Sequence, residues 1–244
     1  ALVDGSVKSV HVTEKNVEQY LGVRRFLPEK LSGEELVGVV NGLAWTSVGG
    51  ELLEVEVNVV PGSGRIELTG NLGDVMKESA HAALSYIRSR SAQLGVEPNF
   101  YKDKDIHVHF PEGAVPKDGP SAGIAITTAI VSALTDTPVR RGIAMTGEVT
   151  LRGRVLPIGG LREKTMAAMR NGITTVIFPA ANQKDLEEID QTVRAALHFI
   201  PVEQADQVLA AALSGKVEQA AEGGVRPAAE PCKNAGHGIS AVCQ

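Results

Sequence analysis

Apolar and polar residues alternate along residues 53–59, where Leu53 and three valines occupy every odd position. A period of two is typical of a strand with one buried face. The Pro-Gly-Ser-Gly segment at 61–64 is a turn signal, and it predicts a hairpin between this strand and the one after it. We therefore expect strands over most of residues 36–70.

Further along the chain, the apolar spacing switches between helical and strand-like periods. At 74–94, five apolar residues fall on one side of a predicted helix. Within residues 8–22 we expect a short helix, capped by Thr13 and closed by Gly22. We expect other helices at 124–134, 161–172 and 204–213, with a helical turn at 182–189. We expect other strands at 105–110, 174–180 and 196–202, and strands with turns over 143–160. This mixture predicts an α/β domain of mixed α+β character.

Composition narrows the class of protein. Hydrophobic residues make up 43% of the 244 residues, whereas aromatic residues make up 4%, so we expect an aliphatic core. The formal charge of -5 argues against nucleic acid as the main partner. No apolar run approaches the roughly 20 residues of a membrane span. The first residues lack a signal-peptide pattern and an initiator Met, so we expect a fragment of a longer chain.

The last residues differ in character from the rest. Residues 216–244 are rich in Gly, Ala and Pro, have no apolar periodicity and are expected to form a flexible tail. The only two cysteines are Cys232 and Cys243, so no disulfide framework supports the body, which favours a cytosol-like compartment. With His237 they could offer three metal ligands, but this spacing fits no common zinc pattern.

The segment PKDGPSAG, residues 116–123, places Ser121 where a long apolar helix is predicted to begin. Pro120 suits the first helical position, and the free N–H groups of the first turn favour negative charge. Backbone N–H groups of Gly119, Ser121 or Ala122 are the candidates for an oxyanion hole. A helix cap is the simpler interpretation of the serine alone. The segment also fits G-x-S-x-G, but a loop rather than a strand precedes it, so we do not expect an α/β-hydrolase.

A serine nucleophile requires a base, and histidine and lysine are both candidates. His107 and His109 share one face of a predicted strand and could bind a metal, although no third ligand is evident. Lys164 lies on the apolar flank of the helix predicted at 161–172, while its charged neighbours point to the opposite side. It could snorkel to water. A buried lysine instead loses proton affinity and can act as a base, and Ser–Lys pairs are a known form of serine catalysis.

Three segments resemble the proteolytic domain of the Lon family of ATP-dependent proteases, in its A-type branch. They are HVHFPEGAVPKDGPSAG, AMTGEVTLRGRVLPIGGLREK and GLAWTSVGGELLEVE, and the resemblance covers about residues 8–213. It implies that Ser121 is the nucleophile, that Lys164 is the general base, and that the Thr146 hydroxyl helps to hold the lysine. Supporting roles at the active site are implied for the following residues: Glu148, His109, Asp118 and Gly119.

The resemblance also implies properties of the whole molecule. The fold would be related to the second domain of ribosomal protein S5, and the intact enzyme would be a homohexamer in the bacterial cytoplasm, rather than in the mitochondrial matrix. It would degrade unfolded, damaged and regulatory proteins with ATP and magnesium, without contact with a membrane. This fragment would need no cofactor. It would comprise a remnant of the ATPase module at 1–30, the protease domain at 31–215 and the tail at 216–244.

One alternative of a different class stays open. Lon-like domains without catalytic activity serve assembly or binding, and such domains lose the serine or the lysine. This chain has both Ser121 and Lys164. The sequence therefore favours an active serine endopeptidase.

Overall fold

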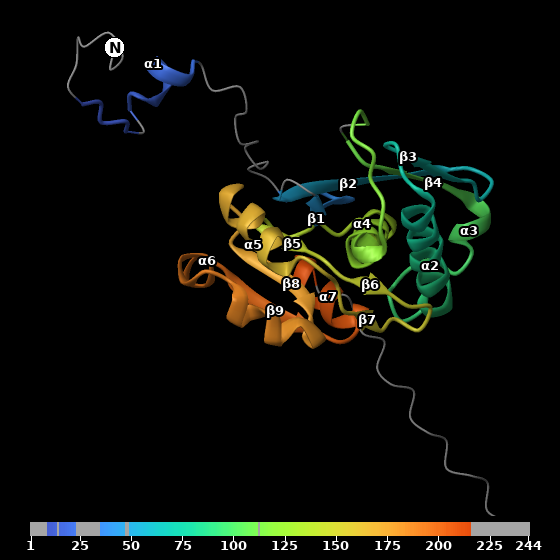
Figure 1. Cartoon of the computed structure of the whole chain (residues 1–244). Coiled ribbons are helices and arrows are strands. Elements are labelled where there is room, and N and C mark those ends of the chain that lie inside the picture. Colours follow the sequence, from blue (N-terminus) through green and yellow to red (C-terminus); the bar gives the residue numbers. More distant parts are fainter. Residues whose placement is uncertain (1–8, 14, 23–34, 47–48, 112, 216–244) are drawn as a thin grey trace, which may run out of the picture.

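The computed structural model describes residues 9–13, 15–22, 35–46, 49–111 and 113–215 (Figure 1). A seven-stranded sheet in the order β3-β4-β2-β1-β5-β8-β9 organises the fold. Its strands are β1 (Val39–Thr46), β2 (Gly49–Pro61), β3 (Ile66–Thr69), β4 (Lys104–His109), β5 (Ile143–Met145), β8 (Thr175–Pro179) and β9 (His198–Val202). Two short strands, β6 (Glu148–Val149) and β7 (Val155–Leu156), pair separately. This confirms the predicted mixed α/β class.

Helices connect these strands and cover the sheet. The α-helices are α1 (Val17–Leu21), α2 (Asp74–Arg90), α3 (Phe100–Asp103), α4 (Gly123–Thr135), α5 (Leu161–Arg170), α6 (Gln191–Ala196) and α7 (Ala205–Ala212). The 3-10 helices are η1 (Pro120–Ala122) and η2 (Ala180–Glu188). β1, β5, β8 and β9 form a parallel group, whereas β2 is antiparallel to both of its neighbours.

The two faces of the sheet bury two separate groups of apolar side chains. On one face, residues of α2, α4 and α7 form the larger group, which includes Val55 and Val57 of β2. On the other face, residues of α5 and α6 pack on the central strands. Neighbouring residues of one strand alternate between the groups: Ile177 belongs to the first, and Val176 and Phe178 belong to the second. Figure 1 shows α5 and α6 on the side of the sheet opposite α4.

Helix α4 is the most deeply buried helix among the described residues. Its first ten residues, 123–132, are all buried, because the helix lies between the sheet and α2 and α7. Two of its buried hydroxyls, those of Thr127 and Thr128, donate to the carbonyls of Gly123 and Ile124, one turn earlier, at 2.8 Å each. Burial on all sides requires an apolar sequence throughout, as the run after Ser121 indicated.

The predicted hairpin at 61–64 is wrong. β2 and β3 do not pair, because β4 lies between them, antiparallel to β2 and parallel to β3. The turn is instead held by Asp105 of β4, whose carboxylate accepts the N–H groups of Ser63 and Arg65 at 2.7 and 2.8 Å. These bonds hold the pKa of Asp105 below its ordinary value. Turn chemistry was correctly identified, but it does not specify which strand becomes the neighbour.

The remaining predictions differ from the structure mainly at element ends. α1 begins after Asn16 rather than at Thr13, and the Asn16 side chain accepts the Thr13 N–H at 2.6 Å. The predicted end at Gly22 is confirmed by its φ of 80°. Helices α3 and α6 were not predicted. The predicted tail at 216–244 and its candidate metal ligands lie outside the described residues.

Candidate active site

The candidate residues come together where the chain crosses from one face of the sheet to the other. Helix α4 packs on the first face and leads into β5, and α5 follows on the opposite face. Ser121 lies in η1, directly before α4, Thr146 follows β5 directly, and Lys164 lies in α5.

Ser121 is half-buried in the first turn that leads into α4. Pro120 occupies the first position of η1, as predicted, and α4 continues from it. Gly119 precedes it with φ 115° and ψ 158°, a conformation open essentially to glycine alone. No atom would obstruct a Cβ at Gly119, so the backbone conformation, rather than crowding, requires glycine there.

Two consecutive residues after β5 hold the backbone of Ser121. The Gly147 N–H donates to the Ser121 carbonyl at 2.8 Å. The Thr146 hydroxyl donates to the same carbonyl at 3.4 Å, which is at the long limit for a hydrogen bond. A Cβ at Gly147 would lie 2.8 Å from the Val155 side chain and 3.1 Å from the Ile124 side chain, so a larger residue here would force these side chains to shift.

Lys164 is buried, with 2% of its surface exposed, as its position on the apolar flank predicted. Its Nζ donates to the Thr146 hydroxyl at 3.0 Å. Burial lowers the pKa of Lys164 from 10.5 to about 8, because removing an ammonium group from water disfavours the charged form. No carboxylate forms an ion pair with Lys164 within the described parts of the chain. The lysine is therefore poised to lose its proton near neutral pH.

The close approach of α5 to the sheet explains how the lysine becomes buried. A Cβ at Gly50 would lie 2.0 Å from the Glu163 carbonyl, so β2 can pass under the helix only because residue 50 is glycine. Gly160 turns the chain into α5 with φ 70°. Leu161, Lys164 and Ala168 then face the sheet together.

The structure brings Ser121, Thr146 and Lys164 into one connected group through Thr146. Its hydroxyl accepts from Lys164 Nζ and donates to the Ser121 carbonyl. Among the described residues, no hydrogen bond joins the Ser121 hydroxyl to Lys164 Nζ. The lysine is thus held beside the backbone of the serine, and contact between the two side chains is a further step.

Asp118 fastens the serine loop to helix α2. Its carboxylate oxygen accepts the N–H of Met76, in the first turn of α2, at 3.0 Å and the N–H of Gly119 at 2.9 Å. The loop backbone adds a bond from the Gly73 N–H to the Lys117 carbonyl at 2.8 Å. A Cβ at Gly73 would lie 2.3 Å from Asp118 Cγ, so glycine is needed at this contact. Asp118 therefore positions the loop.

Glu148 and His109 lie in strands, and neither has a described bond to the serine or the lysine. Glu148 is half-buried in β6 and pairs with Leu156. His109 Nδ1 and His107 Nε2 share the Thr69 hydroxyl at 2.7 and 2.8 Å.

In the described ranges, no three His, Cys, Asp or Glu residues are arranged to hold a metal ion. Nor is any helix there both long and apolar enough to cross a membrane.

Sequence reasoning missed two residues that hold the serine loop. The Ser79 hydroxyl, on α2, donates to the Pro120 carbonyl at 3.4 Å, and Gly147 donates to Ser121 as described above. Ser79 lies three residues after Met76 and four before Ala83, which are both buried, so a polar residue interrupts the apolar side of the helix. That interruption was the available signal. The sequence around Gly147 gave no such signal, since its role depends on a backbone hydrogen bond to a residue that is distant in the sequence.

Comparison with known proteins identifies the chain first as a proteolytic domain. The family model described as "Lon protease (S16) C-terminal proteolytic domain" matches residues 11–215. The Lon protease of Azorhizobium caulinodans is 59% identical over 212 residues, which is 87% of this chain and 25% of that protein. The chain belongs to the Lon protease (S16) family, in its bacterial A-type branch, as the C-terminal proteolytic domain.

Other Lon proteases match this chain with similar sequence identity and over a similar share of its length. The Lon protease of Brucella suis is 60% identical over 202 residues, covering 83% of this chain and 25% of that protein. Lon protease 1 of Bacillus subtilis is 55% identical over 216 residues, covering 88% of this chain and 28% of that protein. The chain thus spans about a quarter of the length of these relatives.

Proposed function

We propose that this domain hydrolyses peptide bonds with Ser121 as the nucleophile and Lys164 as the general base. The observation that carries the proposal is the buried Lys164, whose Nζ is bonded to Thr146, the residue that also contacts the Ser121 backbone. A lysine whose pKa is lowered to about 8 has a neutral fraction near physiological pH that an ordinary lysine lacks, and this fraction can act as the base. A histidine base is less well supported, because the described bonds of His109 go to Thr69.

The reaction follows from these positions. The neutral Lys164 amine takes the Ser121 proton while the serine oxygen bonds to the peptide carbonyl carbon. The lysine then gives this proton to the leaving nitrogen as the C–N bond breaks, leaving an acyl ester on Ser121. Water, deprotonated by the same amine, breaks the ester and restores the serine hydroxyl. Rotation of the Ser121 side chain toward Nζ supplies the contact that the free domain lacks.

The structure leaves fewer candidate donors for the oxyanion hole than the three N–H groups considered from the sequence. The Gly119 N–H already donates to Asp118, and Pro120 has no N–H. The first turn of a helix leaves N–H groups without acceptors inside the helix, so the Ser121 and Ala122 N–H groups are the remaining donors for the developing negative charge. Asp118 and Ser79 position this turn from α2.

For the whole protein, we propose the following assignment from its relatives' names and the resemblance. It is a homohexameric protease of the bacterial cytoplasm that uses ATP and magnesium to degrade unfolded, damaged and regulatory proteins. The domain itself uses no cofactor. In this chain, residues 1–30 would belong to the end of the ATPase module, 31–215 to the protease domain and 216–244 to a tail without a catalytic role.

Covalent labelling distinguishes this function from a catalytically silent binding domain. A serine-reactive peptidyl phosphonate should label the wild-type chain at one site, and peptide mapping should locate the label at Ser121. Lys164→Met should label far more slowly, because the serine then lacks its base. The absence of labelling, or labelling elsewhere, would favour the silent domain.

A further inference from the structure

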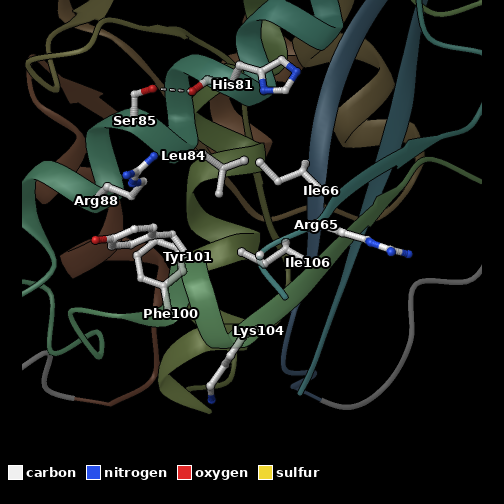
Figure 2. A pocket seen from close by; sticks show the side chains of 11 residues that line it. Arg65, Ile66, His81, Leu84, Ser85, Arg88, Phe100, Tyr101, Lys104 and Ile106 are labelled. Atoms are coloured by element: carbon white, nitrogen blue, oxygen red, sulfur yellow. Dashed lines mark hydrogen bonds between the residues drawn. The ribbon is translucent and has the colours of Figure 1, made fainter. Parts of the chain in front are cut away.

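A pocket away from the serine lies between α2, α3 and the strands β3 and β4. Its volume is about 150 Å³. Leu84 of α2, Ile66 of β3 and Ile106 of β4 form its apolar lining together with Phe100 and Tyr101 of α3. Figure 2 shows Leu84 and Ile66 facing each other across the pocket. The active-site residues described above do not line it.

Basic residues surround this apolar lining. The Arg88 guanidinium lies 4.0 Å from the centre of the Tyr101 ring, a cation–π geometry, at one margin of the pocket (Figure 2). His81 lies about two turns before Arg88 in α2, and Arg65 and Lys104 are at the strand side, with their charged ends directed outward. No Asp or Glu is among the described residues that line the pocket. The Arg88 guanidinium at the margin therefore favours an anionic occupant, in a chain whose net charge is -5.

Size and charge together define the occupant. A cavity of about 150 Å³ can hold a benzene-sized group, and it is smaller than the roughly 300–1,000 Å³ of ordinary small-molecule sites. Arginine at the margin matches a carboxylate. We propose that this pocket is a second docking site for polypeptide substrates, and that it takes an aromatic side chain flanked by Asp or Glu. The proposal rests on the proteolytic function proposed above.

Helix α2 connects the pocket to the serine loop. The helix carries Leu84 and Arg88 at the pocket, and its Met76 and Ser79 bond to the loop at Asp118 and Pro120. Nine residues of helix separate Ser79 from Arg88, about 14 Å at 1.5 Å per residue. An extended peptide covers that distance with roughly four residues. A substrate docked at the pocket would therefore present bonds at least about four residues away for cleavage, at a raised local concentration.

Binding is measured on the full chain carrying Ser121→Ala, so that peptides stay intact. The probes are three fluorescein-labelled decapeptides in a Gly-Ser background, with the centres Glu-Phe-Glu, Gln-Phe-Gln and Glu-Ala-Glu. Fluorescence anisotropy should give a Kd for Glu-Phe-Glu about tenfold below those of the other two. Equal affinity for all three peptides would overturn the proposal.

Variants at the pocket test where the peptide binds. Arg88→Glu reverses the charge at the margin, and Ser85→Trp places a large ring in the pocket from an exposed position. Each should weaken Glu-Phe-Glu binding about tenfold. Arg90→Glu makes the same charge change on the same helix outside the pocket and should leave the affinity unchanged. An equal loss in Arg90→Glu would mean that net charge alone attracts the peptide, which overturns a built site.

The same experiments distinguish other occupants of the pocket, and they separate a failure of the docking site from a failure of the proposed catalysis. Self-association that Arg88→Glu abolishes, without peptide binding, would assign the pocket to a second copy of the chain. Tighter binding of a single-stranded oligonucleotide, dependent on Arg88, would assign it to nucleic acid. Either result overturns the peptide site. A wild-type chain that binds Glu-Phe-Glu at Arg88 but cleaves no peptide would refute the catalytic proposal, while the docking site would stand.

Discussion

Lys164 and Arg88 are basic side chains that both contact apolar groups, yet one is buried and the other is exposed. Lys164 is 2% exposed and bonded to a single hydroxyl, whereas Arg88 is exposed and lies over an aromatic ring. Burial lowers the pKa of the lysine to about 8, whereas an arginine keeps its proton at any ordinary pH. The first site is therefore suited to moving a proton, and the second to binding a fixed negative charge.

The largest expected effect is at the serine. Ser121→Ala should abolish peptide cleavage, and Lys164→Ala should do nearly the same, because members of a catalytic pair act as a unit. Steady-state cleavage of a fluorogenic peptide measures the loss, and circular dichroism checks that the fold is intact. Unchanged turnover in a clean Ser121→Ala preparation would refute the nucleophile.

The next effect is on stability. The folded-state pKa of Lys164, about 8, lies below the ordinary 10.5, so the unfolded chain binds more protons between these pH values. The stability of the folded wild-type domain should therefore rise with pH across this window, relative to that of the Lys164→Met variant. Between pH 10.5 and pH 8, the wild-type chain should lose about 3 kcal/mol of stability relative to Lys164→Met. Urea unfolding at several pH values measures this, and a pH-independent difference would contradict a buried, titrating lysine.

A smaller effect is expected at Thr146. Thr146→Val removes the hydroxyl that joins Lys164 to the Ser121 carbonyl. The plateau rate should fall roughly tenfold or more because the amine loses its position. The pKa seen in the rate profile should also fall, since the protonated lysine loses its acceptor. Thr146→Ser keeps a hydroxyl and should restore most activity. An equal defect in both variants would indicate a packing role.

The smallest effect is expected at the end of the chain. Residues from about 222 onward have no apolar periodicity, so deleting them should change the Tm only slightly. Differential scanning fluorimetry of the full and shortened chains makes the comparison. A decrease of several degrees would show that this segment packs on the domain.

The sequence was most informative where local chemistry decides the structure. Helical spacing correctly placed Lys164 on the buried side of α5, and Pro120 marked the first turn before α4. It was least informative where distant segments meet. The turn at 61–64 gave no sign that β4 inserts between β2 and β3, and nothing near Gly147 indicated its bond to Ser121. Such contacts depend on which strands become neighbours, a property of the whole chain.

The pH dependence of peptide cleavage most directly tests Lys164 as the base. The rate should rise along a single ionisation near pH 8, where the buried lysine loses its proton, and then level off. Lys164→Arg keeps a similar length and charge but cannot deprotonate, so it should be nearly inactive at every pH. Substantial activity in Lys164→Arg, with an unchanged pH profile, would contradict the Ser121–Lys164 pair and make His109 the better candidate base.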